Sequence, residues 1–388
     1  MKRYYYIICL FFMLLADAIN AQNAAWWTVQ FTIAATLPPD VNKQVATGFA
    51  GAVAGVHQNY LLVAGGANFP EAMPWQGGKK HYHDTVYVFT TKNQQIELIN
   101  QSFKLPEKIA YAAVCNVSDG ILYIGGENEN GISNKVWLLQ WNQYKKQVTS
   151  KAYPPIPVAL TNAAVTVINK KVYVVGGETT NEATNHFFML DLTNVLAGWK
   201  TLPAVPQAVS HSVLVGIGNA TNPALYLMGG RKKNSNGIST LYNNMYEFDL
   251  LNNRWNEKAS LPYALSAGTG VWCMADQIVL FGGDRGTVFT QVETLLAAIA
   301  NETNPDKKQV FINQKNQLQS THPGFSNEVL LYQANKNEWQ SIGKIPFETP
   351  VTTTAVKWNG AVYLPTGETK AGVRSPYILK ATIHHNRK

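Results

Sequence analysis

The amino-acid sequence predicts an all-β fold, a six-bladed β-propeller closed by a strand from the N-terminal end. Three observations predict it. A short apolar run that ends in a glycine pair recurs along the chain, with a sixth, degenerate copy. A Leu-Pro or Ile-Pro dipeptide precedes each run. One N-terminal segment with strand character belongs to none of the six units, so it is available to complete the last of them.

The glycine pairs mark the repeating units. Their second glycines are Gly66, Gly126, Gly177, Gly230, Gly283 and Gly367, which gives intervals of 60, 51, 53, 53 and 84 residues. Each interval is long enough for four short strands. A continuous apolar run is typical of a strand that neighbours cover on both faces. Glycines at its end let the chain turn where backbones crowd around a central channel.

Two further markers share this period. The dipeptides are Leu37-Pro38, Leu105-Pro106, Ile156-Pro157, Leu202-Pro203, Leu261-Pro262 and Ile345-Pro346. An aromatic residue and then a tryptophan follow several glycine pairs, as in Phe188 with Trp199, Tyr246 with Trp255 and Tyr332 with Trp339. A single unit cannot bury both of its faces, and six units solve this by closing into a ring.

The ring also needs a closing strand, and the two ends of the chain supply it. The last unit has a strand from Tyr377 through Ile383, with no outer tryptophan strand after it. Residues 25–31, which include Trp26-Trp27, lack a unit of their own. We therefore expect them to form the fourth strand of the sixth blade, which removes the exposed sheet edges.

The long fifth interval indicates an insertion at about residues 286–327. The stretch Thr290–Ala300 has helical character, and residues 306–319 are polar and favour a second helix. We interpret the insertion as a cap over the channel mouth that excludes water or closes on a sugar. The alternative is a surface excursion with no role in a site.

Composition excludes several classes of protein. Of the 388 residues 46% are apolar and only 14% are charged, which argues against disorder and against a long helical bundle. The net charge is +8, but the basic residues are scattered in short groups such as Lys79-Lys80 and Lys307-Lys308. Nucleic-acid binding is therefore not expected. A mildly basic protein suits an acidic small molecule.

The N-terminus predicts export. Lys2 and Arg3 precede an apolar stretch over residues 4–16, and Ala18 and Ala21 provide small residues for cleavage. We expect a signal peptide at residues 1–21, a single mature propeller at 22–388, a periplasmic location and no stable membrane insertion after processing. The alternative is an uncleaved membrane anchor, although the apolar stretch is short for one.

The residues that follow the glycine pairs are the candidate site. They are Ala67, Glu127, Glu178, Arg231, Asp284 and Glu368, of which five ionise. Propellers bind ligands at the mouth of the channel, where equivalent loops converge; the alternative is that these are solvated turn residues. In the sixth unit Glu368 precedes Arg374 by six residues. A carboxylate there can act as general acid or base, and a guanidinium can bind a carboxylate, unless the two form only a surface ion pair.

At this loop the sequence resembles a known family. The repeat is similar to kelch repeats, and the segment from Gly367 to Arg374 resembles the active-site loop of the bacterial N-acetylneuraminate epimerases, the sialic-acid mutarotases. The segments at residues 65–69 with His83-Asp84, 125–127 and 229–237 resemble the same family. The blades follow the same circular order from a different start, as in a cyclically permuted branch. One departure is Ala371-Gly372-Val373, where the family form has Pro-Gly-Leu.

The resemblance implies a secreted isomerase that interconverts the α and β anomers of N-acetylneuraminate. It implies Glu368 as the catalytic acid/base and Arg374 as the residue that holds the sugar carboxylate. It further implies substrate contacts for the residues Asn68, His83, Glu127 and Arg231, with Glu127 also a candidate for the second proton transfer. No cofactor or metal is expected, because His81 and His83 alternate on one face of a strand without a third ligand.

Two other functions fit a propeller of this type. A non-catalytic kelch module would bind a glycan or a protein at the same mouth without chemistry. A copper radical oxidase would need a cysteine cross-linked to a tyrosine, together with histidine ligands. Cys115 and Cys273 lie in apolar runs without such histidines, which argues against the oxidase.

Overall fold

Six antiparallel sheets form the propeller. The computed structural model describes residues 27–39, 45–93, 95–99, 103–218 and 223–385. Blade 1 consists of β2 (Val53–His57), β3 (Tyr60–Ala64), β6 (Thr85–Lys92) and β7 (Gln95–Leu98), and the short β8 (Phe103–Lys104) also pairs with β6. Blade 2 consists of β9 (Ala113–Val117), β10 (Gly120–Ile124), β13 (Val136–Asn142) and β14 (Gln147–Tyr153). Blade 3 consists of β15 (Ala164–Ile168), β16 (Lys171–Val175), β17 (Phe187–Asp191) and β18 (Trp199–Thr201).

The last three blades follow the same plan. Blade 4 consists of β19 (Val213–Ile217), β20 (Ala224–Met228), β23 (Met245–Asp249) and β24 (Arg254–Lys258). Blade 5 consists of β25 (Thr269–Trp272), β26 (Gln277–Phe281), β27 (Glu328–Gln333) and β28 (Glu338–Lys344). Blade 6 consists of β29 (Val356–Trp358), β30 (Ala361–Lys370), β31 (Val373–His385) and β1 (Trp27–Thr36). The predicted all-β, six-bladed fold is confirmed.

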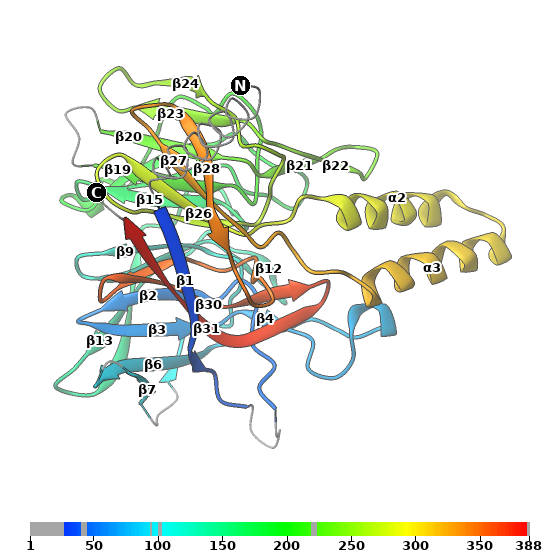
Figure 1. The fold of residues 1–388 in the computed structure, drawn as a ribbon, viewed down its shortest axis with the longest axis horizontal. Helices are drawn as coiled ribbons and strands as arrows, with labels where there is room; N and C mark the ends of the chain where they lie inside the picture. The colour runs from blue at the N-terminus through cyan, green and yellow to red at the C-terminus, as the bar shows by residue number, and fades with distance from the viewer. Residues whose placement is uncertain (1–26, 40–44, 94, 100–102, 219–222, 386–388) are drawn as a thin grey trace, which may run out of the picture.

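The sixth blade is closed by strand exchange between the two ends of the chain, as predicted. β1 pairs antiparallel with β31, from Trp27 opposite His385 to Thr36 opposite Tyr377. In Figure 1 the blue β1 lies against the red β31. The closing strand extends further than expected, to Thr36, while Trp26 lies outside the described residues. The exchange covers the edge that β31 would otherwise expose.

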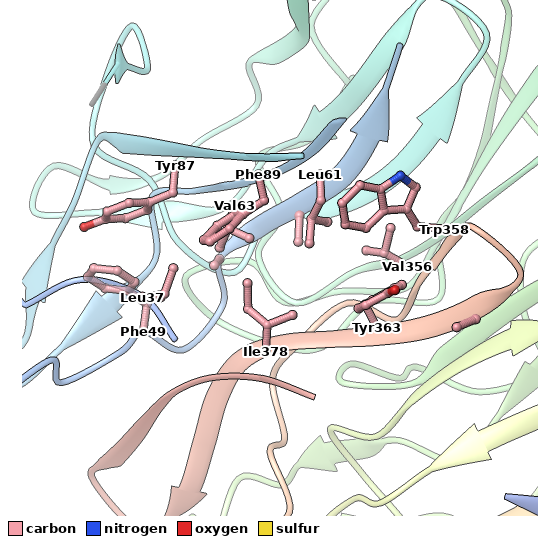
Figure 2. Close-up of a cluster of buried hydrophobic side chains, with 13 residues drawn as sticks. Leu37, Phe49, Leu61, Val63, Tyr87, Phe89, Val356, Trp358, Tyr363 and Ile378 are labelled. Atoms are coloured by element: carbon pink, nitrogen blue, oxygen red, sulfur yellow. The ribbon is translucent and has the colours of Figure 1, made fainter. Parts of the chain in front are cut away.

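The core lies between the blades. Figure 2 shows the cluster shared by blades 6 and 1, in which Leu61 and Phe89 of blade 1 face Trp358, Tyr363 and Ile378 of blade 6. The equivalent clusters link each remaining pair of neighbouring blades. Burial of one such side chain contributes roughly 1.5–3 kcal/mol. Each apolar run is covered on both faces because its blade has two neighbours.

The glycine pairs turn the chain from the second strand of a blade into the mouth. The first glycine of each pair has a φ between 57° and 64°, and in the sixth unit Thr366 takes this position with a φ of 55°. A Cβ at Gly176 would come within 2.1 Å of the carbonyl oxygen of Val209 in the next blade. Glycine is therefore required there by both backbone conformation and close approach.

A closed ring of backbone hydrogen bonds surrounds the channel. Six residues, one from each blade, adopt a φ between 50° and 64°: Gly51, Tyr111, Asn162, His211, Ala267 and Thr352. The N–H of each donates to the carbonyl of the preceding one at 2.8–3.1 Å, and Gly51 donates to Thr352. We call these six residues the inner ring. The ring fixes the blades to each other at the point where the mouth begins.

One predicted marker was assigned to the wrong dipeptide. The apolar residue before proline donates its N–H to the loop before the third strand of the preceding blade, as Ile156 does to Asn134. In the fourth unit this bond is made by Val205 to Asn185, whereas Leu202 directly follows the outer strand β18 and donates to the Phe187 carbonyl. The equivalent marker is therefore Val205-Pro206 and not Leu202-Pro203.

The insertion in blade 5 forms the two predicted helices, α2 (Thr287–Asn301) and α3 (Pro305–Ser320). In Figure 1 they lie side by side on the same side of the propeller as the short hairpins β4–β5 (Ala67–Asn68, His81–Tyr82), β11–β12 (Glu127–Asn128, Gly131–Ile132) and β21–β22 (Arg231–Lys233, Ser239–Leu241). The buried carboxylate of Glu293 in α2 accepts two hydrogen bonds from Ser239 of β22, at 2.6 and 2.9 Å. α3 contacts the 3-10 turn η2 (Pro74–Gln76) of blade 1, while a second such turn, η3 (Val195–Ala197), lies in blade 3. No helix among the described residues is long and apolar enough to span a bilayer.

Candidate active site

The residues after the glycine pairs occupy equivalent positions, as predicted. Each forms an antiparallel bridge with the residue that precedes an inner-ring residue, as in Ala110 with Glu127 and Val351 with Glu368. The mouth therefore has two rings of side chains, the inner ring and this outer one. Below them the channel holds a cavity of about 370 Å³, lined by the first strands of the blades and by Tyr111, Asn162, His211 and Thr352.

Glu368 and Arg374 face each other across a β-hairpin. β30 and β31 pair them in register, and Gly372 with a φ of 77° forms the turn. Arg374 Nη1 lies 2.9 Å from Glu368 Oε1, and the backbone N–H of Gly372 donates to the same oxygen at 2.8 Å. The Arg374 side chain is only 4% exposed and that of Glu368 is 21% exposed. The pair is therefore not the solvated surface ion pair that was the alternative.

Blade 1 completes the surroundings of Arg374. Its Nε donates to the carbonyl of Ala67 at 3.4 Å, and its guanidinium lies 5.1 Å from the centre of the Phe69 ring. Burial lowers the pKa of Arg374, but the Glu368 carboxylate and Tyr111 outweigh burial and raise it. The guanidinium stays charged and fixes a positive charge beside Glu368.

Glu127 is held by two donors from blade 1. Lys80 Nζ lies 3.1 Å from its Oε1, and the Tyr82 hydroxyl donates to the same oxygen at 2.8 Å. The Lys80 ammonium also lies over the Tyr111 ring at 5.0 Å. Burial, reinforced by the hydrogen bond to Glu127, raises the pKa of Tyr82 to about 12. Both donors reach the same oxygen, and the Glu127 side chain is 21% exposed, as is that of Glu368, so Glu127 stays a candidate for the second proton transfer.

The structure brings Asn68 and His83 together. Asn68 is 1% exposed, and its amide donates to Thr47 Oγ1 at 3.0 Å and to the Gly48 carbonyl at 3.1 Å. Its Oδ1 lies 2.9 Å from His83 Nε2, so this ring nitrogen carries the proton. In this arrangement Asn68 supports the loop of blade 1 and presents little surface to a ligand.

Arg231 is held by a chain of hydrogen bonds that the sequence did not indicate. Its Nη2 lies 3.1 Å from Nε2 of His211, an inner-ring residue. His211 Nδ1 lies 3.0 Å from Ser210 Oγ, which donates to Glu178 Oε1 at 2.6 Å. Burial and the charge of Arg231 lower the pKa of His211 well below its ordinary value. The ring is therefore neutral at neutral pH.

Asp284 lies between the loops of blades 4 and 6. Its Oδ1 accepts from the Gly286 N–H at 2.8 Å. Burial raises the pKa of Asp284, and the Glu368 charge adds to the increase, while the Gly286 N–H, Arg231 and His322 oppose it. His322, which follows α3, was not singled out in the sequence. A cavity of about 690 Å³ at the base of the insertion is lined in part by Asp284 and His322.

His322 is a second group whose pKa is shifted. Its Nδ1 accepts from the Gly324 N–H at 3.0 Å, so Nε2 carries the proton in the neutral ring. Burial lowers the pKa of His322, although the charges of Asp284 and Glu368 act in the opposite direction. Within the described ranges, no three His, Cys, Asp or Glu side chains lie close enough to share a metal ion.

The fold is a six-bladed propeller, and a ring of mostly ionisable residues surrounds the mouth of its channel. A family model described as N-acetylneuraminate epimerase matches residues 14–148 and 153–388, so the chain belongs to this family. It is similar to the N-acetylneuraminate epimerase of Salmonella typhimurium, with 28% identity over 241 residues and 60% of each chain covered. It is also similar to that of Yersinia enterocolitica, with 25% identity over 263 residues, 61% of this chain and 64% of the relative. The match thus spans less than two thirds of these relatives.

Proposed function

We propose that this protein is an isomerase that interconverts the α and β anomers of N-acetylneuraminate at the channel mouth. Membership of the N-acetylneuraminate epimerase family supports the substrate and the reaction. The observation that carries the proposal is the Glu368–Arg374 hairpin, which holds a partly exposed carboxylate against a buried guanidinium in the mouth ring. Such a carboxylate is a positioned acid/base group.

Anomer exchange needs two coupled proton transfers. Glu368 takes the proton from the hydroxyl on C2, the electron pair of that O–H bond forms the C2 carbonyl, and the bond from C2 to the ring oxygen breaks. The ring oxygen takes a proton from a second group. Rotation of the open chain presents the other carbonyl face, and the reverse steps close the ring. Positioned acid/base groups accelerate such steps by about 10²–10⁴-fold.

Arg374 has a positioning role in this scheme. The sequence-based expectation was that it holds the sugar carboxylate. Its side chain is 4% exposed and lies against Glu368 Oε1, with its Nε directed to the Ala67 carbonyl. This geometry favours a role in which Arg374 orients the Glu368 carboxylate.

Asp284 is the best-supported donor of the second proton. It is adjacent to Glu368 around the ring, and among the described residues no Lys or Arg nitrogen lies within ion-pair distance of it. Its raised pKa favours the protonated form that a general acid requires. Two carboxyl groups whose surroundings differ in this way suit opposite roles in one reaction.

The test follows the exchange between α- and β-N-acetylneuraminate by NMR. The protein should accelerate exchange, and Glu368→Gln should reduce the acceleration by about 10²–10⁴-fold. Glu348→Gln is the matched control, because Glu348 is an exposed carboxylate that is ion-paired with Lys370 in the neighbouring loop. Equal exchange rates with and without the wild-type protein would contradict the proposal. Saturable sugar binding without exchange would favour a non-catalytic binding module instead.

Export and blade order are part of the same proposal. The expected signal peptide at residues 1–21 lies outside the described residues. We propose a periplasmic enzyme whose blades are cyclically shifted relative to the enteric relatives. The mass of the protein recovered from a periplasmic extract tests export, because retention of residues 1–21 would contradict it. Separate alignment of each blade with the relatives tests the shift.

A further inference from the structure

We propose that Arg231 binds the carboxylate of the acidic sugar, and that His211, Ser210 and Glu178 position it for that task. Selection for an acidic sugar would then reside in blades 3 and 4, apart from the Glu368–Arg374 hairpin. The inference rests on the proposed function for the identity of the sugar. It concerns binding and specificity, so it can fail or hold independently of the proton transfers.

Arg231 is a cation that no carboxylate of the described chain neutralises directly. Arg374 lies 2.9 Å from Glu368, and Arg285 lies 2.9 Å from Glu328. Arg231 instead donates to an imidazole nitrogen at 3.1 Å. Only one of its five N–H groups has a protein acceptor in the described residues. A half-buried guanidinium with free donors at a channel mouth is suited to bind a ligand carboxylate through two parallel hydrogen bonds.

The chemistry of Arg231 fixes the direction of each hydrogen bond between Arg231 and Glu178. A guanidinium only donates, so His211 Nε2 accepts and the ring proton is on Nδ1. The Nδ1–H of His211 donates to Ser210 Oγ at 3.0 Å, and the Ser210 hydroxyl donates to Glu178 Oε1 at 2.6 Å. The negative charge of Glu178 therefore orients the chain without pairing with the guanidinium. A direct ion pair would have occupied the donors that a ligand needs.

A neutral His211 is necessary for this arrangement. A protonated ring would place a second cation 3.1 Å from Arg231 and remove the acceptor that orients it. Burial and the Arg231 charge both oppose protonation of the ring. The relay therefore persists through the neutral pH range.

The helical insertion holds the other side of Arg231. The guanidinium lies 4.3 Å from the centre of the Phe289 ring in α2. The contact of Glu293 with Ser239 anchors α2 to the hairpin that begins with Arg231. The plane of the guanidinium is thus fixed between an imidazole and an aromatic face. The insertion acts here as a fixed wall of the binding site.

Arg231 faces the same mouth as the proposed catalytic groups. Asp284 lies in the blade between and interacts electrostatically with both Arg231 and Glu368. The sugar carboxylate is bonded to C2, the carbon at which the ring opens. A carboxylate bound to Arg231 would therefore direct C2 towards Asp284 and Glu368.

The experiment compares N-acetylneuraminate with its methyl ester, which has nearly the same shape but no charge. Affinity is measured by calorimetry and exchange by NMR for the full chain. We expect Arg231→Met to raise the Kd and KM for the acid by about 10- to 100-fold, with kcat changed less than about threefold. The preference for the acid over the ester should fall to near one. Arg231→Lys should restore part of that preference, because it keeps the charge without the planar fork.

Ser210→Ala tests the relay, and Ser212→Ala is its control. Ser212 lies two residues away, and its hydroxyl has no hydrogen-bond partner among the described residues. We expect Ser210→Ala to raise KM by about three- to tenfold, while Ser212→Ala leaves KM unchanged. Arg285→Met controls for the loss of any arginine near the insertion. Thermal unfolding of each variant shows whether it folds.

Two outcomes would overturn the inference. An unchanged acid-to-ester preference in both Arg231 variants would do so, and so would a loss of that preference in Arg374→Met alone. Failure of the proposed function looks different, because the wild-type protein would then not accelerate exchange. The binding comparison would still report whether Arg231 selects the carboxylate.

Discussion

Blades 6 and 4 each place a guanidinium at the same mouth, but the partner of the guanidinium is a carboxylate in blade 6 and a neutral imidazole in blade 4. In blade 6, Arg374 is 4% exposed and lies 2.9 Å from Glu368 on the facing strand. In blade 4, Arg231 is half-buried and is held by a neutral imidazole. A cation neutralised within its own hairpin organises an acid/base group, whereas a cation held by an uncharged ring remains available to a ligand.

The strands explain how blade 6 achieves this pairing. β30 and β31 are long, at 10 and 13 residues, because both continue past the blade into the hairpin, and β31 also pairs with β1 from Tyr377 to His385. Their hairpin carries Glu368 and Arg374 to opposite positions. In blade 4 the hairpin of β21 and β22 is a separate small sheet, and Ser239 within it is engaged by the insertion. The strand that pairs with the closing strand β1 therefore also carries Arg374.

Among the variants that test this comparison, Arg374→Met has the largest expected effect. Loss of this guanidinium leaves Glu368 without its positive partner, and we expect kcat for anomer exchange to fall on the order of 100-fold with little change in KM. Saturation kinetics by NMR measure both constants. Arg374→Lys should retain part of kcat, because it keeps the charge. A rise in KM with an intact kcat would reverse the comparison and make Arg374 the carboxylate-binding residue.

Asp284→Asn should have the next largest effect. As a proposed general acid, Asp284 must be protonated, so activity of the wild-type protein should decrease as pH rises through its elevated pKa. We expect the variant to lose about tenfold or more in kcat and to lose that pH dependence. A pH profile of kcat from 4 to 8, which spans roughly the range over which a shifted carboxyl titrates, measures it.

Stability of the Asp284 variant gives an independent check with a defined sign. A carboxyl whose pKa is higher in the folded state stabilises the fold only while it is protonated. The contribution is complete below the ordinary pKa of 3.8 and is lost as pH rises through the folded-state value. The melting temperature of Asp284→Asn should therefore rise relative to the wild type as pH increases from acid to neutral. A constant difference between the two would contradict the raised pKa.

The fold was predictable because its main signals are carried by residue type. Glycine pairs, apolar runs and the unpaired N-terminal segment each follow from burial or backbone conformation. The inner ring was not predictable for the opposite reason. Gly51, Tyr111, Asn162, His211, Ala267 and Thr352 share a positive φ and a hydrogen-bond position, but no side-chain property. The misassigned marker at Leu202 has a similar origin, since two apolar-Pro dipeptides lie three residues apart and only the pairing of Val205 distinguishes them.

The candidate site, like the fold, has a part that local sequence predicts and a part that depends on contacts between blades. Glu368 and Arg374 lie six residues apart in one hairpin, so local sequence sufficed to pair them. The relay behind Arg231 joins Glu178 to Ser210, which are 32 residues apart and belong to different blades. Its histidine occupies an inner-ring position at which the other blades have Gly, Tyr, Asn, Ala or Thr. His322 follows α3 at the end of the insertion, whose position depends on the contacts of α2 with blade 4 and of α3 with blade 1.

Thr366→Val tests the backbone difference between blade 6 and the other five. Thr366 holds the left-handed conformation that glycine holds elsewhere, and its hydroxyl oxygen accepts from the Phe49 N–H at 2.7 Å and lies 2.6 Å from the Ser375 carbonyl. Valine keeps the strain and loses these hydrogen bonds, at a cost of about 2–4 kcal/mol in the free energy of unfolding.

Thr366→Gly sharpens that test, because glycine relieves the strain at the same position. We expect it to be about 1 kcal/mol more stable than the valine variant in urea denaturation. Thr28→Val, on the exposed face of β1, should change the free energy of unfolding by less than about 0.5 kcal/mol. A valine variant as stable as the wild type would show that the hydroxyl does not offset the strain.

The smallest expected effect is that of Lys370→Met. Lys370 lies on the same hairpin as Arg374, and its Nζ is 2.7 Å from Glu348, but the two side chains are 39% and 58% exposed. Exposure weakens the attraction, and salt screens it, so the free energy of unfolding should change by less than about 1 kcal/mol and lose this difference at high ionic strength. Anomer exchange should be unchanged. A hundredfold loss of kcat, as expected for Arg374→Met, would mean that net charge on the hairpin decides activity. The burial that separates Arg374 from Lys370 would then have no part in it.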